Sequence, residues 1–237
     1  MERNDNHPPD DAGPAQPKTP APSPAPAIVP LAAADMEAAA RLYTRVFLED
    51  EPTSRRRALD PARFLPYARI YVRWLIEKDL SFLAKDAMTG ELLGFVFCFD
   101  FLDDPGRESP ELQEFILNFR HAVTMIDELE ARHIPRESVM PGSALHIFQV
   151  GVGRKGRRRG IARAMIRRVL THAGERGFHK VVADCTNTIS QRVFEQCGFS
   201  VVGFSSYESF SMDGTCFFSG IPGGISLMVV DLPPVLF

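Results

Sequence analysis

One short stretch, residues 150–162, constrains the fold and the ligand of this chain more than any other. It reads VGVGRKGRRRGIA and connects a predicted strand over residues 144–152 to a predicted helix over residues 160–176. The first N–H groups of a helix have no partner within it, and the helix dipole places partial positive charge there. From Arg154 to Arg168 the chain carries eight bases and no acid, and Gly156 and Gly160 leave room beside the backbone. The stretch therefore predicts a phosphate or pyrophosphate site.

Two nucleotide motifs and a plain basic surface are the alternatives for this stretch. Gly151, Gly153 and Gly156 match the dinucleotide pattern G-x-G-x-x-G, but the helix begins only near Gly160 and no series of βαβ units surrounds it. No Lys-Ser or Lys-Thr pair follows the glycines, which excludes a P-loop. A solvated basic face or a nucleic-acid patch stays open, although such a face does not need glycines at these positions.

The first thirty residues set the predicted domain boundary. They hold 9 of the 19 prolines and no aromatic residue, so they cannot bury enough apolar surface to offset the entropy cost of ordering. We predict a disordered Pro/Ala-rich tail over residues 1–27 and a single domain over residues 28–237. Beyond the first thirty residues, 25 bases stand against 26 acids, so net charge predicts no nucleic-acid partner.

Cysteine, histidine and apolar patterning predict a cytoplasmic protein without a metal or membrane site. The N-terminus has no apolar core of signal-peptide length, and the longest apolar run, residues 92–99, is too short to span a bilayer. Four scattered cysteines show no C-x-x-C spacing, and no two of the six histidines stand four residues apart. We expect reduced thiols and no bound metal.

Apolar periodicity predicts a mixture of helices and strands. The run over residues 92–100 is almost continuously apolar, which is typical of a strand buried on both faces. Asp60 and Pro61 predict the start of a helix, and Pro66 is a candidate restart of it. The other predicted helices cover residues 32–47, 110–132, 160–176 and 188–197, and the other strands cover residues 80–85, 144–152, 180–185, 199–209, 215–219 and 226–231.

Two motifs resemble those of the GNAT acetyltransferase superfamily. The first is R-x-x-G-x-A, formed here by Arg157, Arg158, Arg159, Gly160, Ile161 and Ala162, which resembles the acetyl-coenzyme A signature of that family. The second runs from Asn187 through Ser190 and Phe194 to Gly198-Phe199. The two motifs stand in the family's order and at its separation. The order of predicted elements also fits, so the resemblance extends over about residues 28–232.

A closer resemblance is to the arylalkylamine (dopamine-type) N-acetyltransferases. Like them, the chain has an acidic Asp-Glu-Pro segment after its first helix, at Asp50-Glu51-Pro52. It also has a long predicted helix before the central strand. The pattern Ser-x-x-x-Ser-x-Arg-Val of that group resembles Thr186-x-x-x-Ser190-x-Arg192-Val193.

The resemblance implies a single α+β domain of GNAT type. Its mixed, mostly antiparallel sheet would have six to seven strands, a splayed parallel central pair and helices on both faces. It implies acetyl-CoA as co-substrate, no metal, and a small primary amine as acceptor, in a monomer or homodimer. The pantetheine arm would pair with the backbone of Val150, Gly151 and Val152. The pyrophosphate would lie on residues 157–162, with Asn187 and Phe194 completing the coenzyme site.

The same resemblance implies direct attack of the amine on the thioester, assisted by a base. A primary alkylamine is only about one part in a thousand neutral at pH 7, so a group must remove a proton before attack. Glu51 is the candidate base, and Thr186 and Ser190 would supply hydroxyls. Phe194 stands where the superfamily often has a tyrosine that protonates the leaving thiolate. A non-catalytic acyl-CoA-binding or interaction protein on the same fold is therefore the alternative.

Aromatic residues between positions 64 and 99 are candidates for an apolar acceptor pocket, although aromatic residues at these spacings more often belong to the core. These are Phe64, Tyr67, Tyr71, Trp74 and the phenylalanines of residues 95–99.

Overall fold

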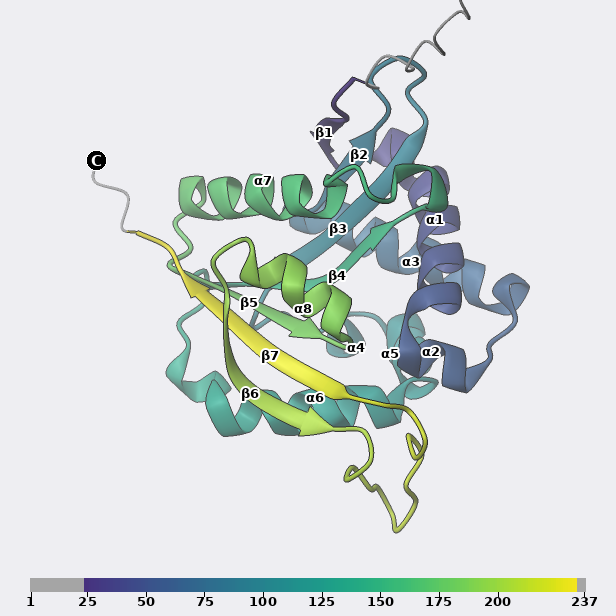
Figure 1. Cartoon of the computed structure of the whole chain (residues 1–237), viewed down its shortest axis with the longest axis vertical. Helices are drawn as coiled ribbons and strands as arrows, with labels where there is room; N and C mark the ends of the chain where they lie inside the picture. The colour runs from purple at the N-terminus through teal and green to yellow at the C-terminus, as the bar shows by residue number, and fades with distance from the viewer. Residues whose placement is uncertain (1–23, 234–237) are drawn as a thin grey trace, which may run out of the picture.

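A single seven-stranded sheet organises the chain (Figure 1). The computed structural model describes residues 24–233, so most of the predicted tail lies outside the described residues. The strand order is β1-β2-β3-β4-β5-β7-β6, and every neighbouring pair is antiparallel except β4 and β5. The strands are β1 (Ala27–Pro30), β2 (Phe82–Lys85), β3 (Leu92–Asp100), β4 (Ala144–Val152), β5 (Lys180–Cys185), β6 (Ser200–Ser206) and β7 (Gly224–Asp231).

Helices cover both faces of this sheet (Figure 1). None of those within residues 24–233 combines the length and apolar character that crossing a membrane requires. The helices are α1 (Met36–Asp50), α2 (Pro52–Arg57), α3 (Pro61–Lys78), α4 (Pro105–Glu108), α5 (Pro110–Leu117), α6 (Arg120–His133), α7 (Ile161–Glu175) and α8 (Thr188–Glu195).

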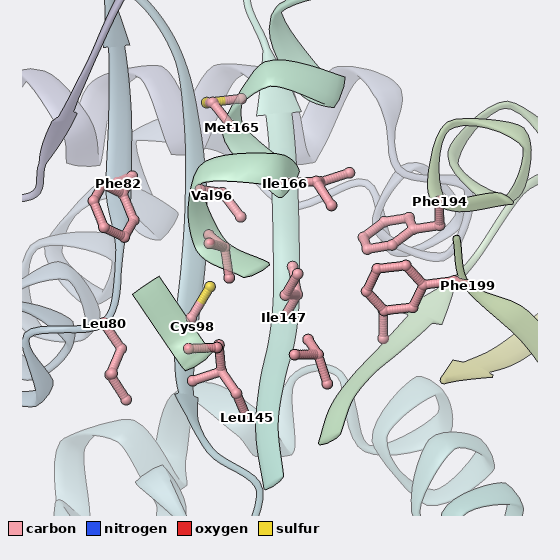
Figure 2. Packing of buried hydrophobic residues seen from close by; sticks show 14 of the residues in the cluster. Leu80, Phe82, Val96, Cys98, Leu145, Ile147, Met165, Ile166, Phe194 and Phe199 are labelled. Atoms are coloured by element: carbon pink, nitrogen blue, oxygen red, sulfur yellow. The ribbon is translucent and has the colours of Figure 1, made fainter. Parts of the chain in front are cut away.

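Helices α7 and α8 close one face of the sheet. Met165 and Ile166 of α7 pack in one core cluster with Val96 and Cys98 of β3 and Ile147 of β4 (Figure 2). In the same cluster the Phe194 ring of α8 meets the Phe199 ring edge-on, with ring centroids 4.9 Å apart. This face is therefore buried and close-packed beside the basic loop that precedes α7.

The opposite face carries two separate cores. The first lies under α1, α3 and α5, where Tyr43 is in ring contact with Phe95 and Phe97 of β3. The second lies under α6, where Leu129 packs with Val182 of β5 and neighbouring residues of β7. Because the two helix groups cover different strands, the centre of this face, above β4, is left for the site described below.

The central strands β4 and β5 are paired over only part of their length. Their parallel register runs from Ala144 opposite Lys180 to Ile147 opposite Ala183, and the strands then diverge (Figure 1). At the point of divergence the β3–β4 register shifts, so that Phe97 faces Gln149 and Cys98 faces Ile147, leaving Phe148 as a bulge. Within the described residues, β4 beyond Ile147 has no strand partner on its β5 side. A free strand edge results.

The predicted fold class is confirmed, including the splayed parallel pair and helices on both faces. The helix that begins at Asp60-Pro61 is also confirmed: the Asp60 carboxylate accepts the Ala62 N–H and caps α3. A restart at Pro66 is wrong, because α3 continues through it. Pro66 lies early in the helix, so only one backbone hydrogen bond is lost there.

Two further predictions about secondary structure are corrected. The predicted helix over residues 110–132 is broken at Asn118 and Phe119, which allows α5 to pack against α3 while α6 packs on β5 and β7. The predicted strand over residues 215–219 is absent, and those residues belong to the β6–β7 connection. Its apolar character arises because Phe218 is buried in the core under α6 and Phe217 stacks on His121. Strand β1 was not predicted.

Candidate active site

A cavity of about 570 Å³ lies above β4, between the two helix groups of that face. The predicted catalytic residues Glu51, Thr186 and Ser190 all line it, although they come from two distant parts of the sequence. Three of the aromatic residues named above, Tyr71, Phe95 and Phe99, also line it, whereas Phe64 and Trp74 are buried core residues. The walls are thus largely aromatic, with polar groups at defined points, as is usual for small-molecule sites.

Glu51 enters this cavity as the N-cap of α2. Pro52 restricts its backbone to an extended conformation, so α1 ends at Asp50 and α2 begins at once. Its Oε2 accepts the Ser54 N–H at 2.5 Å and the hydroxyls of Thr53 and Ser54 at 2.6 Å, whereas its Oε1 accepts only the Thr53 N–H at 3.1 Å. The carboxylate is therefore held in one place, and Oε1 keeps capacity for another donor.

Thr186 and Ser190 lie where β5 ends and α8 begins. The Asn187 side chain accepts the N–H groups of Ile189 and Ser190 and so caps α8. The Ser190 hydroxyl donates to the Asn187 carbonyl at 2.8 Å, and the Thr186 carbonyl accepts the buried Tyr207 hydroxyl at 2.9 Å. Asn187 was predicted to bind the coenzyme; within the chain, its side-chain oxygen positions the start of α8 and hence Ser190.

Phe194 lies in the dry core under α8 and also borders the cavity. Its ring is 2 % exposed and packs on Phe199, so this position offers no proton donor (Figure 2). The neighbouring Cys185 is buried, which raises the pKa of its thiol to about 12 and keeps it protonated. The thiol is therefore no nucleophile at neutral pH, as expected for a buried strand residue.

The loop before α7 adopts its shape for two structural reasons. Gly160 has φ +71° and takes the N-cap position of α7 without any side-chain cap, which leaves the first N–H groups of the helix free for a ligand. Gly156 is buried, and a Cβ there would lie 2.9 Å from the Val152 side chain and 3.1 Å from the Leu93 carbonyl. The expectation that Gly156 admits a ligand is therefore replaced by a packing role.

The basic residues of this loop meet acids from other segments. Arg157 donates to the Asp50 carboxylate, beside Glu51, and to the Val152 carbonyl. In addition, Arg154 pairs with Glu49, Lys155 with Glu91, and Arg159 with Asp86. The loop is acid-free in sequence but not in space, which argues against a simple basic surface for nucleic acid. Val150, Gly151, Arg158, Ile161 and Ala162 lie on β4, the loop and the first turn of α7, and their coenzyme assignment stays a prediction.

A buried cluster of titratable side chains lines the same cavity, and the sequence did not predict it. The His146 Nε2 atom lies 2.8 Å from Asp184 Oδ2 and 3.6 Å from Glu130 Oε1, and all three side chains are more than nine-tenths buried. Burial raises the pKa of Glu130 to about 8 and that of Asp184 to about 7, and it lowers the pKa of His146. Near neutral pH the cluster therefore retains protons, mainly on Glu130, while the His146 imidazole is neutral.

Four buried side-chain polar atoms in the described residues have no hydrogen-bond partner. They are Tyr71 Oη, Gln149 Oε1, Glu130 Oε1 and Asp184 Oδ1, and all four belong to residues that line this cavity. Buried polar atoms without partners are rare and costly. Their gathering here marks the cavity as a site for a polar ligand.

The cluster also bears on the prediction of no metal site. One ligand-type atom from each of Glu130, His146 and Asp184 lies within 4.8 Å of the others. These residues are on α6, β4 and β5, so no local spacing reveals them. No further observation points to a metal, and the absence of one stays a prediction.

Comparison with known proteins identifies the family. The Acetyltransferase (GNAT) family matches residues 36–199, most of the chain. Among solved structures, arylalkylamine N-acetyltransferase 2 from Aedes aegypti is similar with a TM-score of 0.73 and 18 % identity, covering 88 % of this chain and 99 % of that one. The polyamine N-acetyltransferase of Drosophila melanogaster is similar with a TM-score of 0.64 and 16 % identity, covering 87 % of this chain and 100 % of that one.

A further similar structure is the C-terminal condensation domain of Ebony in complex with β-alanyl-dopamine. It gives a TM-score of 0.69 at 18 % identity, covering 87 % of this chain and 99 % of that one. Identities this low establish the fold, and the family match establishes membership. Together with the splayed β4–β5 pair and the R-x-x-G-x-A loop, they lead to one conclusion: the chain belongs to the acetyltransferase (GNAT) family.

Proposed function

We propose that this protein transfers an acetyl group from acetyl-CoA to a primary amine held in the cavity above β4. The observation that carries the proposal is that one cavity brings Glu51, Thr186 and Ser190 together with Val150 at the free edge of β4. The similar structures include arylalkylamine and polyamine N-acetyltransferases, which supports an amine acceptor.

The residues around β4 fit the coenzyme. A strand edge without a partner offers backbone N–H and C=O groups to the amides of a pantetheine arm. The uncapped N-terminus of α7 and the guanidinium of Arg157 fit a pyrophosphate. Acetyl-CoA supplies an acyl thioester to this place, and backbone N–H groups near Val150 stabilise negative charge that develops on the acyl oxygen.

Glu51 accepts the proton that the incoming ammonium must lose. Its position is fixed by four hydrogen bonds to Thr53 and Ser54, and Oε1 retains room for a substrate or water donor. The neutral amine then attacks the acyl carbon directly. The Thr186 and Ser190 side chains border the same space, and the Thr186 hydroxyl donates to the departing sulfur or to an intervening water. The Ser190 hydroxyl does so only by turning away from the Asn187 carbonyl, to which it donates in this structure. Proton removal of this kind is typically worth 10²- to 10⁴-fold in rate.

The second candidate is a protein on this fold that binds acyl-CoA without catalysing transfer. The observation that favours it is the buried ring of Phe194, which provides no hydroxyl to protonate the thiolate. Transfer remains feasible because a thiolate is a stable leaving group. Both functions involve coenzyme binding, but only the transferase forms an acetylated amine and free CoA.

The direct test is an assay of thiol release from acetyl-CoA with a panel of arylalkylamines, alkylamines and diamines. We expect amine-dependent release of free CoA, with the N-acetylated product seen by mass spectrometry. Stabilisation of the protein against heat by acetyl-CoA without any amine-dependent thiol release would instead support the binding protein. Absence of both would contradict the coenzyme assignment.

Arg157→Ala is expected to raise KM for acetyl-CoA by roughly 10- to 100-fold, because a charge-assisted hydrogen bond to phosphate contributes about 1.5–3 kcal/mol. Steady-state kinetics with acetyl-CoA varied at saturating amine measure it. Asp50→Asn frees the Arg157 guanidinium from its ion pair and is expected to lower the same KM. Arg176→Ala, at the opposite end of α7, is the matched control. An unchanged KM in Arg157→Ala would refute the pyrophosphate assignment.

A further inference from the structure

The cluster of Glu130, His146 and Asp184 is not used by the reaction described above. Along β4, His146 lies in the half paired with β5, and Val150 lies in the free half. Four residues at about 3.3 Å each separate them by roughly 13 Å. The cluster therefore occupies a different part of the cavity from the free strand edge where the thioester is proposed to lie.

We propose that this cluster binds a second cationic group of the acceptor, so that the natural acceptor is a diamine or a guanidino-amine. The inference rests on the proposed function, which it deepens by naming the substrate class. The proximal amine is acetylated beside Glu51, and the distal cation is held by the carboxyls of Glu130 and Asp184. The aliphatic chain between them lies along the aromatic walls.

The charge of the cavity lining supports a cation. Seven acids line the cavity against two arginines, Arg107 and Arg136, and no lysine, while Arg157 and Lys78 from outside the lining pair with Asp50 and Asp103. Arg107 is paired with Asp104, and the Arg136 guanidinium donates to the carbonyls of Leu102 and Asp103. The acids are Asp50, Glu51, Asp103, Asp104, Asp127, Glu130 and Asp184.

The fold leaves one oxygen of each carboxyl in the cluster without a hydrogen-bond partner. Asp184 Oδ1 and Glu130 Oε1 have no partner, although the two side chains are 2 % and 7 % exposed. Beside the cluster, Asp127 adds further negative charge and Arg136 opposes it. An ammonium brings three N–H donors and a guanidinium five, which matches acceptors held this close together. A neutral alkyl end would leave them unpaired at a cost.

The cavity shape favours an organic cation over a metal ion. A volume of about 570 Å³ lined by rings from α1, α3 and β3 suits a chain that reaches from the free edge of β4 to the cluster. The distance of roughly 13 Å from His146 to Val150 is shared by the cluster side chains at one end, the thioester at the other, and the acceptor between them. We expect an acceptor with a linker of about four to six carbons to fill the part that lies between these groups.

Three acceptors of matched length test the proposal: 1,5-diaminopentane, 5-amino-1-pentanol and pentylamine. We expect kcat/KM for the diamine to exceed that for either other amine by at least about 20-fold, as expected for hydrogen bonds to a charged group. Glu130→Gln and Asp184→Asn are expected to reduce that preference to less than about 3-fold. Glu128→Gln, an exposed neighbour on α6, is the control and retains the preference.

Binding is also measured directly, by calorimetry of 1,5-diaminopentane into the protein with CoA, at pH 7 in two buffers of different ionisation enthalpy. Because burial raises the pKa of both carboxyls, the empty cluster carries protons, and a bound cation displaces them. We expect net proton release in the parent protein and less in Glu130→Gln. This measurement does not depend on acetyl transfer.

Each alternative has a distinct result. Equal kcat/KM for pentylamine and the diamine overturns the proposal, and equal values for the amino-alcohol and the diamine replace the cation by a hydroxyl. Loss of diamine binding on treatment with EDTA, restored by a divalent metal, replaces the organic cation by a metal ion. If no amine is acetylated, the proposed function fails, while proton-linked diamine binding still decides the role of the cluster.

Discussion

Glu51→Gln is expected to lower kcat/KM for the amine by about 10²- to 10³-fold, because the amide cannot take the proton that the ammonium must lose. The loss should be greatest below the pKa of the amine, where almost all of the substrate is charged. Raising the pH supplies free amine from solution and should partly restore the rate of the variant. The measurement is the pH–rate profile of kcat/KM for parent and variant.

Glu51 also caps α2, so the variant needs a control for the loss of a cap. Asp60 offers one, since it caps α3 from an Asp-Pro pair just as Glu51 caps α2 from a Glu-Pro pair. Loss of either cap should lower the free energy of unfolding by about 1 kcal/mol. Asp60→Ala should therefore lose stability while retaining its pH–rate profile. If Glu51→Gln keeps the parent profile as well, Glu51 is only a capping residue and the base lies elsewhere.

The free energy of unfolding should fall as the pH rises from 6.5 to 9, and Glu130→Gln should largely remove this fall. A carboxyl whose pKa is raised on folding contributes stability below its unfolded pKa, and that contribution is lost as the pH rises through its folded pKa. For Glu130 the window runs from about 4.5 to about 8, and for Asp184 from about 3.8 to about 7. The lowered pKa of His146 acts in the opposite sense, but only up to about pH 6.5.

Urea unfolding of the two proteins at pH 6.5 and pH 9 measures this effect. Between these values the variant should gain roughly 1–2 kcal/mol relative to the parent, because only about the last 1.5 pH units below the folded pKa of Glu130 lie in this range, at about 1.4 kcal/mol per unit before discounting. Glu128→Gln, on the solvent side of α6, should follow the parent at both pH values. If the free energy of unfolding of the unsubstituted protein does not fall with pH, the carboxyls of the cluster ionise without destabilising the fold, and the prediction is wrong.

Most of the sheet and the basic loop before α7 were predictable because their signals are local. A nearly continuous apolar run identifies β3, and the Asp60-Pro61 pair marks the start of α3, whereas α2 was not predicted. The R-x-x-G-x-A motif at residues 157–162 and the motif from Asn187 to Phe199 resembled those of the acetyltransferase (GNAT) family, and that resemblance implied the diverging strands. Glu51, Thr186 and Ser190 were then named by resemblance, and the structure brings them to one cavity.

The rest depends on contacts between distant segments. His146, Glu130 and Asp184 each fit an ordinary helix or strand pattern, and only the packing of α6 over β4 and β5 makes them neighbours. The apolar run around Phe218 looked like a strand because a buried side chain in a loop and one in a strand give the same sequence signal. Pairing of β1 with β2 could not be inferred from four residues in a proline-rich stretch.

The bulge at Phe148 lies where the paired half of β4 ends and its free edge begins. The side chains of His146 and Gln149, which flank the bulge, lie on one face of the sheet, and those of Ile147 and Val150 lie on the other. Removing that single residue would leave the alternation of inward and outward side chains intact, so the strand could straighten and still fold. We expect such a deletion to bring β4 back alongside β5, because the bulge lies where their pairing ends. The edge at which the thioester is proposed to lie would then be closed in a protein of the same topology, so that folding and the proposed transfer would be separated at one position.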